Sequence, residues 1–251
     1  MNLIAEELRE ANEYRISTIK SDGGLEIEIA ELSRRNVSII EAMIMHDSSY
    51  LKSIDSENKK STAYWMIELK KSIIKNENER YHEIIRNAVE AVDRDNSTHL
   101  NADRCGREEI SKRILKIPKE KIKEFLYDPV GTNYELIDII SEITHAEKKP
   151  RKNISFASKF CHYAAFYLFE GQQQQDNFSI YDNVLQDNLP RYLKFYGINA
   201  DIKTVKKKKN RDGYVSYQKA VDAVIKASGS RISRNGFDHL VWYYYKGRKN
   251  E

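Results

Sequence analysis

The sequence predicts an all-α protein, and three observations carry this prediction. Most segments of the 251-residue chain repeat apolar side chains at intervals of three and four residues, which places them on one face of a helix. Apolar residues make up 40% of the chain, so it can bury a proper core. Only residues 25–30, LEIEIA, alternate as a strand would, and the overlapping run AELSRRN favours a helix over residues 25–34.

The helices expected in the first part of the chain follow this spacing. They cover residues 2–20, 25–34, 37–46, 61–93 with a break near Asn76, 107–115, 118–127 and 134–147. The Ser-Asp-Gly-Gly run at 21–24 separates the first two, and Pro118 suits the first turn of its helix.

Four further helices are expected in the second part of the chain. They cover residues 153–169, 183–197, 214–227 and 234–246. Pro190 is expected to interrupt the second of these, and Gly197 to end it. The last helix is rich in aromatic side chains, a pattern typical of a core; a platform on which bases stack is the alternative.

The charges are distributed unevenly along the chain. Residues 1–147 carry 22 Lys and Arg against 29 Asp and Glu, a net charge of −7, whereas residues 148–251 carry 20 against 9, a net charge of +11. A basic part of this kind favours a polyanion as partner, and a solvated basic face is the alternative. We therefore expect two helical lobes, over residues 1–133 and 134–251.

Composition argues against several classes of protein. The longest apolar runs fall far short of a membrane span, and the first residues, MNLIAEELRE, lack the basic and apolar blocks of a secretion signal. A cytoplasmic protein with no membrane partner is expected. Cys105 and Cys161 are expected to be buried thiols, with a disulfide or a ligand pair as the alternative, and the scattered histidines predict no metal site.

The stretch KKPRKNISFASKFCHYAAFYLFEGQQQQDNFSIYD, residues 148–182, carries the candidate chemistry. The helices over 134–147 and 153–169 would form a helix-hairpin-helix element around a basic turn. Backbone N–H groups at the start of the second helix would then point at a phosphate. The side chains expected to contact the DNA strand there are Lys148, Lys149, Arg151, Asn153 and Lys159.

Lys152 and Asp182 are the candidate catalytic residues of this stretch. Cleavage of an N-glycosidic bond develops positive charge on the sugar, which a carboxylate such as Asp182 can stabilise. A lysine can attack the sugar carbon as a neutral amine and form a Schiff base. The alternatives are structural: Lys152 as a phosphate contact and Asp182 as a helix cap.

The segments RKNISFASKF and FSIYDNVL resemble the core of the helix-hairpin-helix DNA glycosylase superfamily. They are most similar to its archaeal 8-oxoguanine glycosylase-like branch and to bacterial relatives that excise modified bases from phage DNA. In that branch a Lys heads a helix (K-[TN]-x-x-F-A-x-K) and an I-x-D element follows. The resemblance implies that Lys152 is the Schiff-base lysine and Asp182 the catalytic aspartate.

Two departures from the family accompany this resemblance. KKPRK replaces the L-P-G-V-G type hairpin of most members, and residues 1–147 match nothing in the family. The pocket that selects the base is therefore not inherited from a known member. His162, Tyr163, Phe166 and Tyr181 are the candidates for contacting a base flipped out of the double helix, with core packing as the alternative for each.

The resemblance implies a monomeric glycosylase that acts on double-stranded DNA containing a modified base, without a cofactor. An antiviral role against modified phage DNA, such as DNA with glucosylated hydroxymethylcytosine, is the favoured expectation. An 8-oxoguanine repair glycosylase with or without lyase activity is one alternative. A non-catalytic DNA-binding protein and a protein-interaction module are the others.

Overall fold

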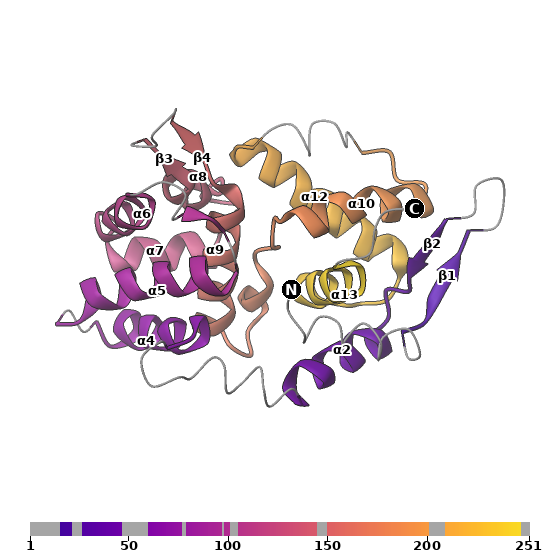
Figure 1. Ribbon diagram of the computed structural model, residues 1–251, viewed down its shortest axis with the longest axis horizontal. Helices are drawn as coiled ribbons and strands as arrows, with labels where there is room; N and C mark the ends of the chain where they lie inside the picture. The colour runs from indigo at the N-terminus through magenta and orange to yellow at the C-terminus, as the bar shows by residue number, and fades with distance from the viewer. Residues whose placement is uncertain are drawn as a thin grey trace. The chain divides into compact units, whose positions relative to one another are not determined.

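The computed structural model describes residues 16–21, 27–46, 60–76, 79–96, 98–100, 105–144, 150–200 and 209–246 (Figure 1). The chain divides into two compact units. Unit 1 comprises Met1–Ile54, Asp182–Lys206 and Ser216–Glu251, and unit 2 comprises Asp55–Tyr181 and Lys207–Val215. The described residues are mostly helical, with two small two-stranded sheets, which confirms the expected all-α fold class.

Unit 2 is built around one buried helix. Its helices are α4 (Thr62–Lys75), α5 (Tyr81–Asp95), α6 (Gly106–Leu115), α7 (Lys119–Tyr127), α8 (Glu135–Ser141) and α9 (Ile154–Leu168), followed by the 3₁₀ helix η2 (Gln173–Asp176). Helix α9 packs against α4, α5, α7, α8 and η2. Most of its buried side chains are apolar, as expected of a helix surrounded by others.

Local signals fix the ends of these helices. The Ser61 hydroxyl accepts a hydrogen bond of 3.2 Å from the backbone N–H of Tyr64 and so caps α4. Asn76, at φ 54°, ends the same helix in the left-handed conformation that asparagine tolerates. Pro118 stands directly before α7. The helices predicted over 61–93, 107–115 and 118–127 are thereby confirmed, including the break near Asn76.

The connection between α8 and α9 differs from the prediction. Helix α8 ends at Ser141 instead of continuing to residue 147, and β3 (Glu142–Ile143) pairs antiparallel with β4 (Arg151–Lys152). The β-branched residues at 143 and 144 favour this extended backbone. The helix-hairpin-helix element is not confirmed. Residues 145–149, with the predicted phosphate contacts Lys148 and Lys149, lie outside the described residues.

The division into units also differs from the two expected lobes. The expected boundary between residues 133 and 134 falls within unit 2. Helix α8, which follows that boundary, packs against α6 and α7, which precede it. The helices on the two sides therefore share one core.

Unit 1 joins segments from both ends of the chain. It contains β1 (Thr18–Lys20), β2 (Glu28–Ala30), α2 (Arg34–His46), α10 (Asn183–Phe195), α13 (Arg234–Tyr245) and most of α12 (Arg211–Ser228), whose first turn belongs to unit 2. The helices predicted over 37–46, 214–227 and 234–246 are confirmed. Gly197, at φ 62°, lies just beyond α10 as expected, but α10 continues through Pro190, so the predicted interruption is wrong.

The helices predicted over 2–20 and 25–34 are wrong where the structure describes them. β1 and β2 pair antiparallel, with Ile19 opposite Ile29. The alternation of LEIEIA therefore outweighs the helical spacing of its neighbours, because β2 buries Ile29 against α10 and α13. Residues 2–15 lie outside the described part of the chain.

Tyrosines of the C-terminal helices complete the core of unit 1. The Tyr245 hydroxyl accepts a hydrogen bond from the Ala30 N–H (3.2 Å), and the Tyr192 hydroxyl donates one to the Ala30 carbonyl (3.1 Å). Phe237 packs edge-on against Tyr192, with ring centroids 5.7 Å apart. The aromatic side chains of α13 are thus largely core, as the sequence indicated.

Candidate functional site

Asp182 stands at the start of α10. Its backbone is extended, and its Oδ1 accepts a hydrogen bond of 3.0 Å from the N–H of Leu185. A carboxylate at this position is stabilised by the positive end of the helix dipole. The cap predicted as the structural alternative therefore exists, and it fixes the orientation of the carboxylate.

The segment before Asp182 is tied to α9 within unit 2. The Tyr181 N–H donates to the Ser158 hydroxyl (3.0 Å), and the Nδ1 of His162 lies 2.8 Å from the Phe178 carbonyl. A carbonyl only accepts, so His162 carries its proton on Nδ1. The Tyr214 hydroxyl donates to the Ser179 carbonyl (3.0 Å). Side chains from two helices therefore hold the backbone that leads to Asp182.

Two of the predicted pocket residues belong to this support. The His162 side chain is buried and stacks on Phe166, with ring centroids 6.3 Å apart. Tyr181 packs edge-on against Tyr214, and burial raises the pKa of the Tyr181 hydroxyl. Both contacts match the core-packing alternative for these residues.

Lys152 lies in β4, two residues before the first residue of α9. The helix cap is the next residue, Asn153, whose Oδ1 accepts a hydrogen bond of 3.0 Å from the Phe156 N–H. The Lys152 ammonium forms an ion pair with Asp138 of α8, and both side chains are partly exposed. Lys152 thus stands before the helix as predicted, but its charge is paired with a carboxylate that the sequence analysis did not consider.

Four of the predicted site residues contact one loop after α5. Its described residues are Asn96, Thr98, His99 and Leu100, and we name it the His99 loop. Asn153 donates from Nδ2 to the Thr98 carbonyl (2.9 Å), Arg151 to the His99 carbonyl (3.2 Å), Lys159 to the Asn96 carbonyl (3.2 Å) and the Tyr163 hydroxyl to Asn96 Oδ1 (2.9 Å). Asn153 and Lys159 are buried and Arg151 is exposed. Residues predicted to contact DNA or a base thus hold a loop.

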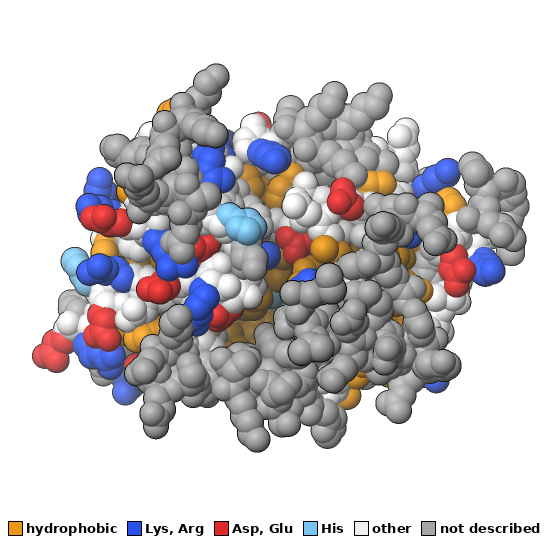
Figure 2. Space-filling view, viewed as in Figure 1, with side chains coloured by type: hydrophobic (Ala, Val, Ile, Leu, Met, Phe, Trp, Pro, Cys, Tyr) orange, Lys and Arg blue, Asp and Glu red, His pale blue; other side chains and the backbone are white. Residues whose placement is uncertain are grey.

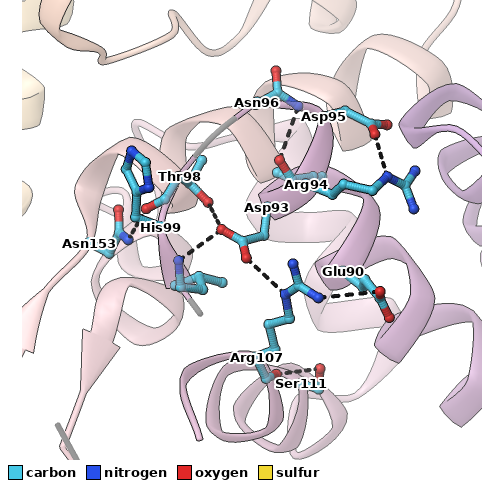
Figure 3. Close-up of polar contacts among 12 residues, drawn as sticks. Glu90, Asp93, Arg94, Asp95, Asn96, Thr98, His99, Arg107, Ser111 and Asn153 are labelled. Carbon is cyan, nitrogen blue, oxygen red and sulfur yellow. Dashed lines mark hydrogen bonds and ion pairs between the residues drawn. The ribbon is translucent and has the colours of Figure 1, made fainter. Parts of the chain in front are cut away.

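A buried carboxylate holds the same loop from its other side (Figure 3). Oδ1 of Asp93 accepts from the Thr98 hydroxyl (2.6 Å) and the Leu100 N–H (2.8 Å), and Oδ2 accepts from the Arg107 guanidinium (2.8 Å). Burial alone would raise the pKa of Asp93, but these hydrogen bonds and the guanidinium charge outweigh it and lower the pKa.

Neither Asp93 nor His99 was predicted from the sequence as a functional residue. One signal could have found the first: Asp93 follows Val89 by four residues, on the buried face of a strongly amphipathic helix. A carboxylate on such a face requires hydrogen-bond donors, which predicts a polar network at the end of α5. His99, one of several scattered histidines, carries no comparable signal.

The surface charge does not form a single patch on the face in view. Figure 2 shows Lys and Arg side chains interspersed with Asp and Glu side chains among the residues described. The basic excess of residues 148–251 includes the run of lysines at 206–209, most of which lies outside the described residues. The charge pattern alone therefore does not identify a binding face.

A groove of about 750 Å³ lies along α6 in unit 2. Charged side chains such as Lys112 and Arg113 line it, together with Cys105 and Ile139. None of the residues predicted to act on DNA contributes to its lining. The groove is therefore separate from the candidate site.

No protein-family model, curated protein or solved structure matches this chain. Among the helices that the structure describes, none is long and apolar enough to cross a bilayer. The described residues also hold no cluster of three or more His, Cys, Asp or Glu side chains suited to a metal ion. Cys161 is a buried thiol, as expected, whereas Cys105 is partly exposed, and the two do not form a disulfide with each other.

Proposed function

We propose that the protein is a DNA glycosylase that cleaves the N-glycosidic bond of a modified base in double-stranded DNA, with Asp182 as the catalytic carboxylate. One observation carries the proposal: the Asp182 carboxylate is oriented by the first turn of α10, and the segment before it is bonded to α9. The resemblance of this segment to helix-hairpin-helix glycosylases supports the same role. We expect the enzyme to act as a monomer in the cytoplasm.

A fixed carboxylate suits this reaction. As the bond between base and sugar breaks, the sugar gains positive charge and the base leaves with the electron pair. A carboxylate held in position stabilises that charge without having to reorganise during the reaction. The hydrogen bond from the Leu185 N–H orients the carboxylate.

Lys152 allows two variants of the reaction mechanism. In the first, one proton of the Lys152 ammonium passes to Asp138, its ion-pair partner, and leaves a neutral amine. The amine lone pair then forms a bond to the sugar carbon as the base departs with the electrons of its own bond. The attacking nitrogen, now cationic, gives up a proton to the departing base, and opening of the sugar ring yields the Schiff base. In the second variant, Asp182 accepts a proton from water, the water attacks the sugar, and Lys152 only contacts phosphate.

The test of the proposal is base release from a panel of DNAs. The panel comprises unmodified, uracil-containing and 8-oxoguanine-containing duplexes, and phage DNA with hydroxymethylated or glucosylated cytosine, with released bases identified by mass spectrometry. We expect one base to be released, and the Asp182→Asn variant to lower the rate by about 100-fold or more, the scale of losing an electrostatic contact to the transition state. The identity of the base separates an antiviral role from 8-oxoguanine repair.

Asp182→Asn separates the charge of Asp182 from its capping role, because asparagine caps helices as well as aspartate does. It removes the charge and keeps the cap. Ser233→Ala is the matched control, since Ser233 caps α13 of the same unit through a 2.9 Å hydrogen bond from Gly236 N–H. Equal activity of Asp182→Asn and the wild type would refute the catalytic role, and DNA binding without release of any base would favour a non-catalytic DNA-binding protein.

Borohydride trapping separates the two variants of the mechanism. A Schiff base between Lys152 and the sugar would be reduced to a permanent protein–DNA adduct, which Lys152→Gln would abolish. Base release without an adduct would identify the water-based mechanism.

A further inference from the structure

Side chains of α5, β4 and α9 and the cap residue Asn153 all form hydrogen bonds with the His99 loop. Its described backbone groups receive hydrogen bonds from Asn153, Arg151 and Lys159, and the Asp93 carboxylate accepts from the loop itself. Lys159 and Asn153 are buried, so each would lose free energy if the loop moved away and left its polar atoms without these acceptors.

The residue at the centre of this framework has an unfavourable backbone conformation. His99 has φ 60°, in the left-handed region that costs a side chain with a Cβ roughly 1 kcal/mol or more. Glycine would avoid that cost. Such conformations persist where the surroundings enforce them, and they cluster at sites of function.

The side chain that this framework presents is exposed. Its two neighbours Thr98 and Leu100 are buried, whereas His99 is exposed and its ring points away from the Asp93 carboxylate in Figure 3. Among the described residues, none forms a hydrogen bond with the imidazole. The Arg151 side chain, also exposed, contacts the His99 carbonyl. The exposed residue His99 thus carries an aromatic ring and accepts a hydrogen bond from a cation at its carbonyl.

We propose that His99 is a DNA-contacting residue and that the Asp93–Arg107 pair and α9 position it. An imidazole can stack on a base or donate a hydrogen bond to a phosphate, and a neighbouring guanidinium favours the polyanion. This inference rests on the proposed function for its ligand, DNA. It gives Asn153, Lys159 and Tyr163 a different role from the one expected: they position the loop that contacts DNA.

His99→Gly tests the inference because it removes the ring and relieves the backbone strain. The probe is a fluorescent duplex with a central tetrahydrofuran abasic analogue, the product shape shared by glycosylases of any base specificity, titrated at low salt. We expect the Kd to rise about fivefold or more, the lower end for losing one ring–base contact, while the Tm stays equal or rises. A residue with a merely structural role would not weaken binding while the fold keeps its stability.

Asn76→Gly is the matched control, because Asn76 is also left-handed (φ 54°) but ends α4. It should bind like the wild type. Unchanged binding by His99→Gly would overturn the inference, as would a wild-type protein that binds no DNA at low salt. If the wild type binds the probe, His99→Gly weakens that binding and no base is released from any DNA, the inference stands and the proposed glycosylase activity falls.

Discussion

Two aspartates at opposite kinds of helix end show how the same side chain serves different purposes. Asp93 lies in the last turn of α5, where the helix dipole disfavours a negative charge, and it is compensated by the Arg107 guanidinium and two further donors. Asp182 stands at the start of α10, where the dipole favours its charge. Asp93 anchors the His99 loop, whereas Asp182 caps α10.

Asp93 shows that a buried carboxylate with several hydrogen-bond donors can have a structural role. The pKa of Asp93 is lowered, and its hydrogen-bond donors and the Arg107 charge account for that shift. Asp182 is proposed as catalytic because of its orientation and sequence context. Four measurements test this distinction.

The largest effect is expected for Asp93→Ala. The substitution leaves the part-buried Arg107 guanidinium without its close partner and removes the acceptor of Thr98 and Leu100, so the free energy of unfolding should fall by about 3–5 kcal/mol. Urea denaturation measures the change. Glu90→Ala is the control, because its half-exposed contact with Arg107 (3.3 Å) should matter by less than about 1 kcal/mol. Similar losses in the free energy of unfolding for the two variants would show that Asp93 does not anchor the loop.

A smaller effect is expected when Asp93 is protonated by acid. Its pKa in the folded protein is lowered from the ordinary 3.8, so its stabilising contribution is fully present above that value and is lost as the pH falls towards the folded-state pKa. Asp93→Asn should therefore flatten the loss of stability below about pH 4, as followed by thermal unfolding at a series of pH values. If Asp93→Asn loses stability at acid pH just as the wild type does, other carboxylates govern that loss.

Replacement of the Asp182 cap should have an effect of intermediate size. Asp182→Ala should lower the free energy of unfolding by about 1 kcal/mol and Asp182→Asn by a few tenths. Ser233→Ala should cost about as much as Asp182→Ala, since both remove one N-cap acceptor in unit 1. If Asp182→Asn lowers the free energy of unfolding by more than about 3 kcal/mol, the Asp182 charge is needed for the fold. A loss of activity in that variant could then not be assigned to catalysis.

The smallest effect on stability is expected for Asp138→Asn. The ion pair of Lys152 and Asp138 is partly exposed, so its loss should change the free energy of unfolding by less than about 1 kcal/mol. Under the Schiff-base variant the same substitution removes the proton acceptor and should lower the yield of borohydride adduct. A stable Asp138→Asn protein with an undiminished adduct would exclude that proton transfer.

Helical periodicity was sufficient to predict most of the fold. The helices of residues 61–93, 107–127 and 183–246 are long or sharply bounded, because capping residues such as Ser61 and Ser233 agree with the spacing of apolar side chains. The short strands could not be predicted in the same way. β3 and β4 have two residues each, too few to establish an alternating pattern.

The candidate site could be predicted only in part. Position relative to helix starts, as for Lys152 and Asp182, follows from local sequence. The partners of Lys152, Asn153 and Lys159 come from 14, 55 and 63 residues away along the chain. No local pattern encodes such pairings, so residues that look like DNA contacts in the sequence can be the supports of a loop.

The hydrogen bonds that the Tyr192 and Tyr245 hydroxyls form with Ala30 have a consequence for folding during synthesis. Synthesis proceeds from the N-terminus, and β2 emerges long before Tyr192 and Tyr245, which lie 162 and 215 residues later. Unit 2 is nearly contiguous in sequence and can begin to assemble while the ribosome is still translating. Unit 1 must wait for the last helix, so a chain released early would retain an unfinished N-terminal hairpin exposed to chaperones and proteases.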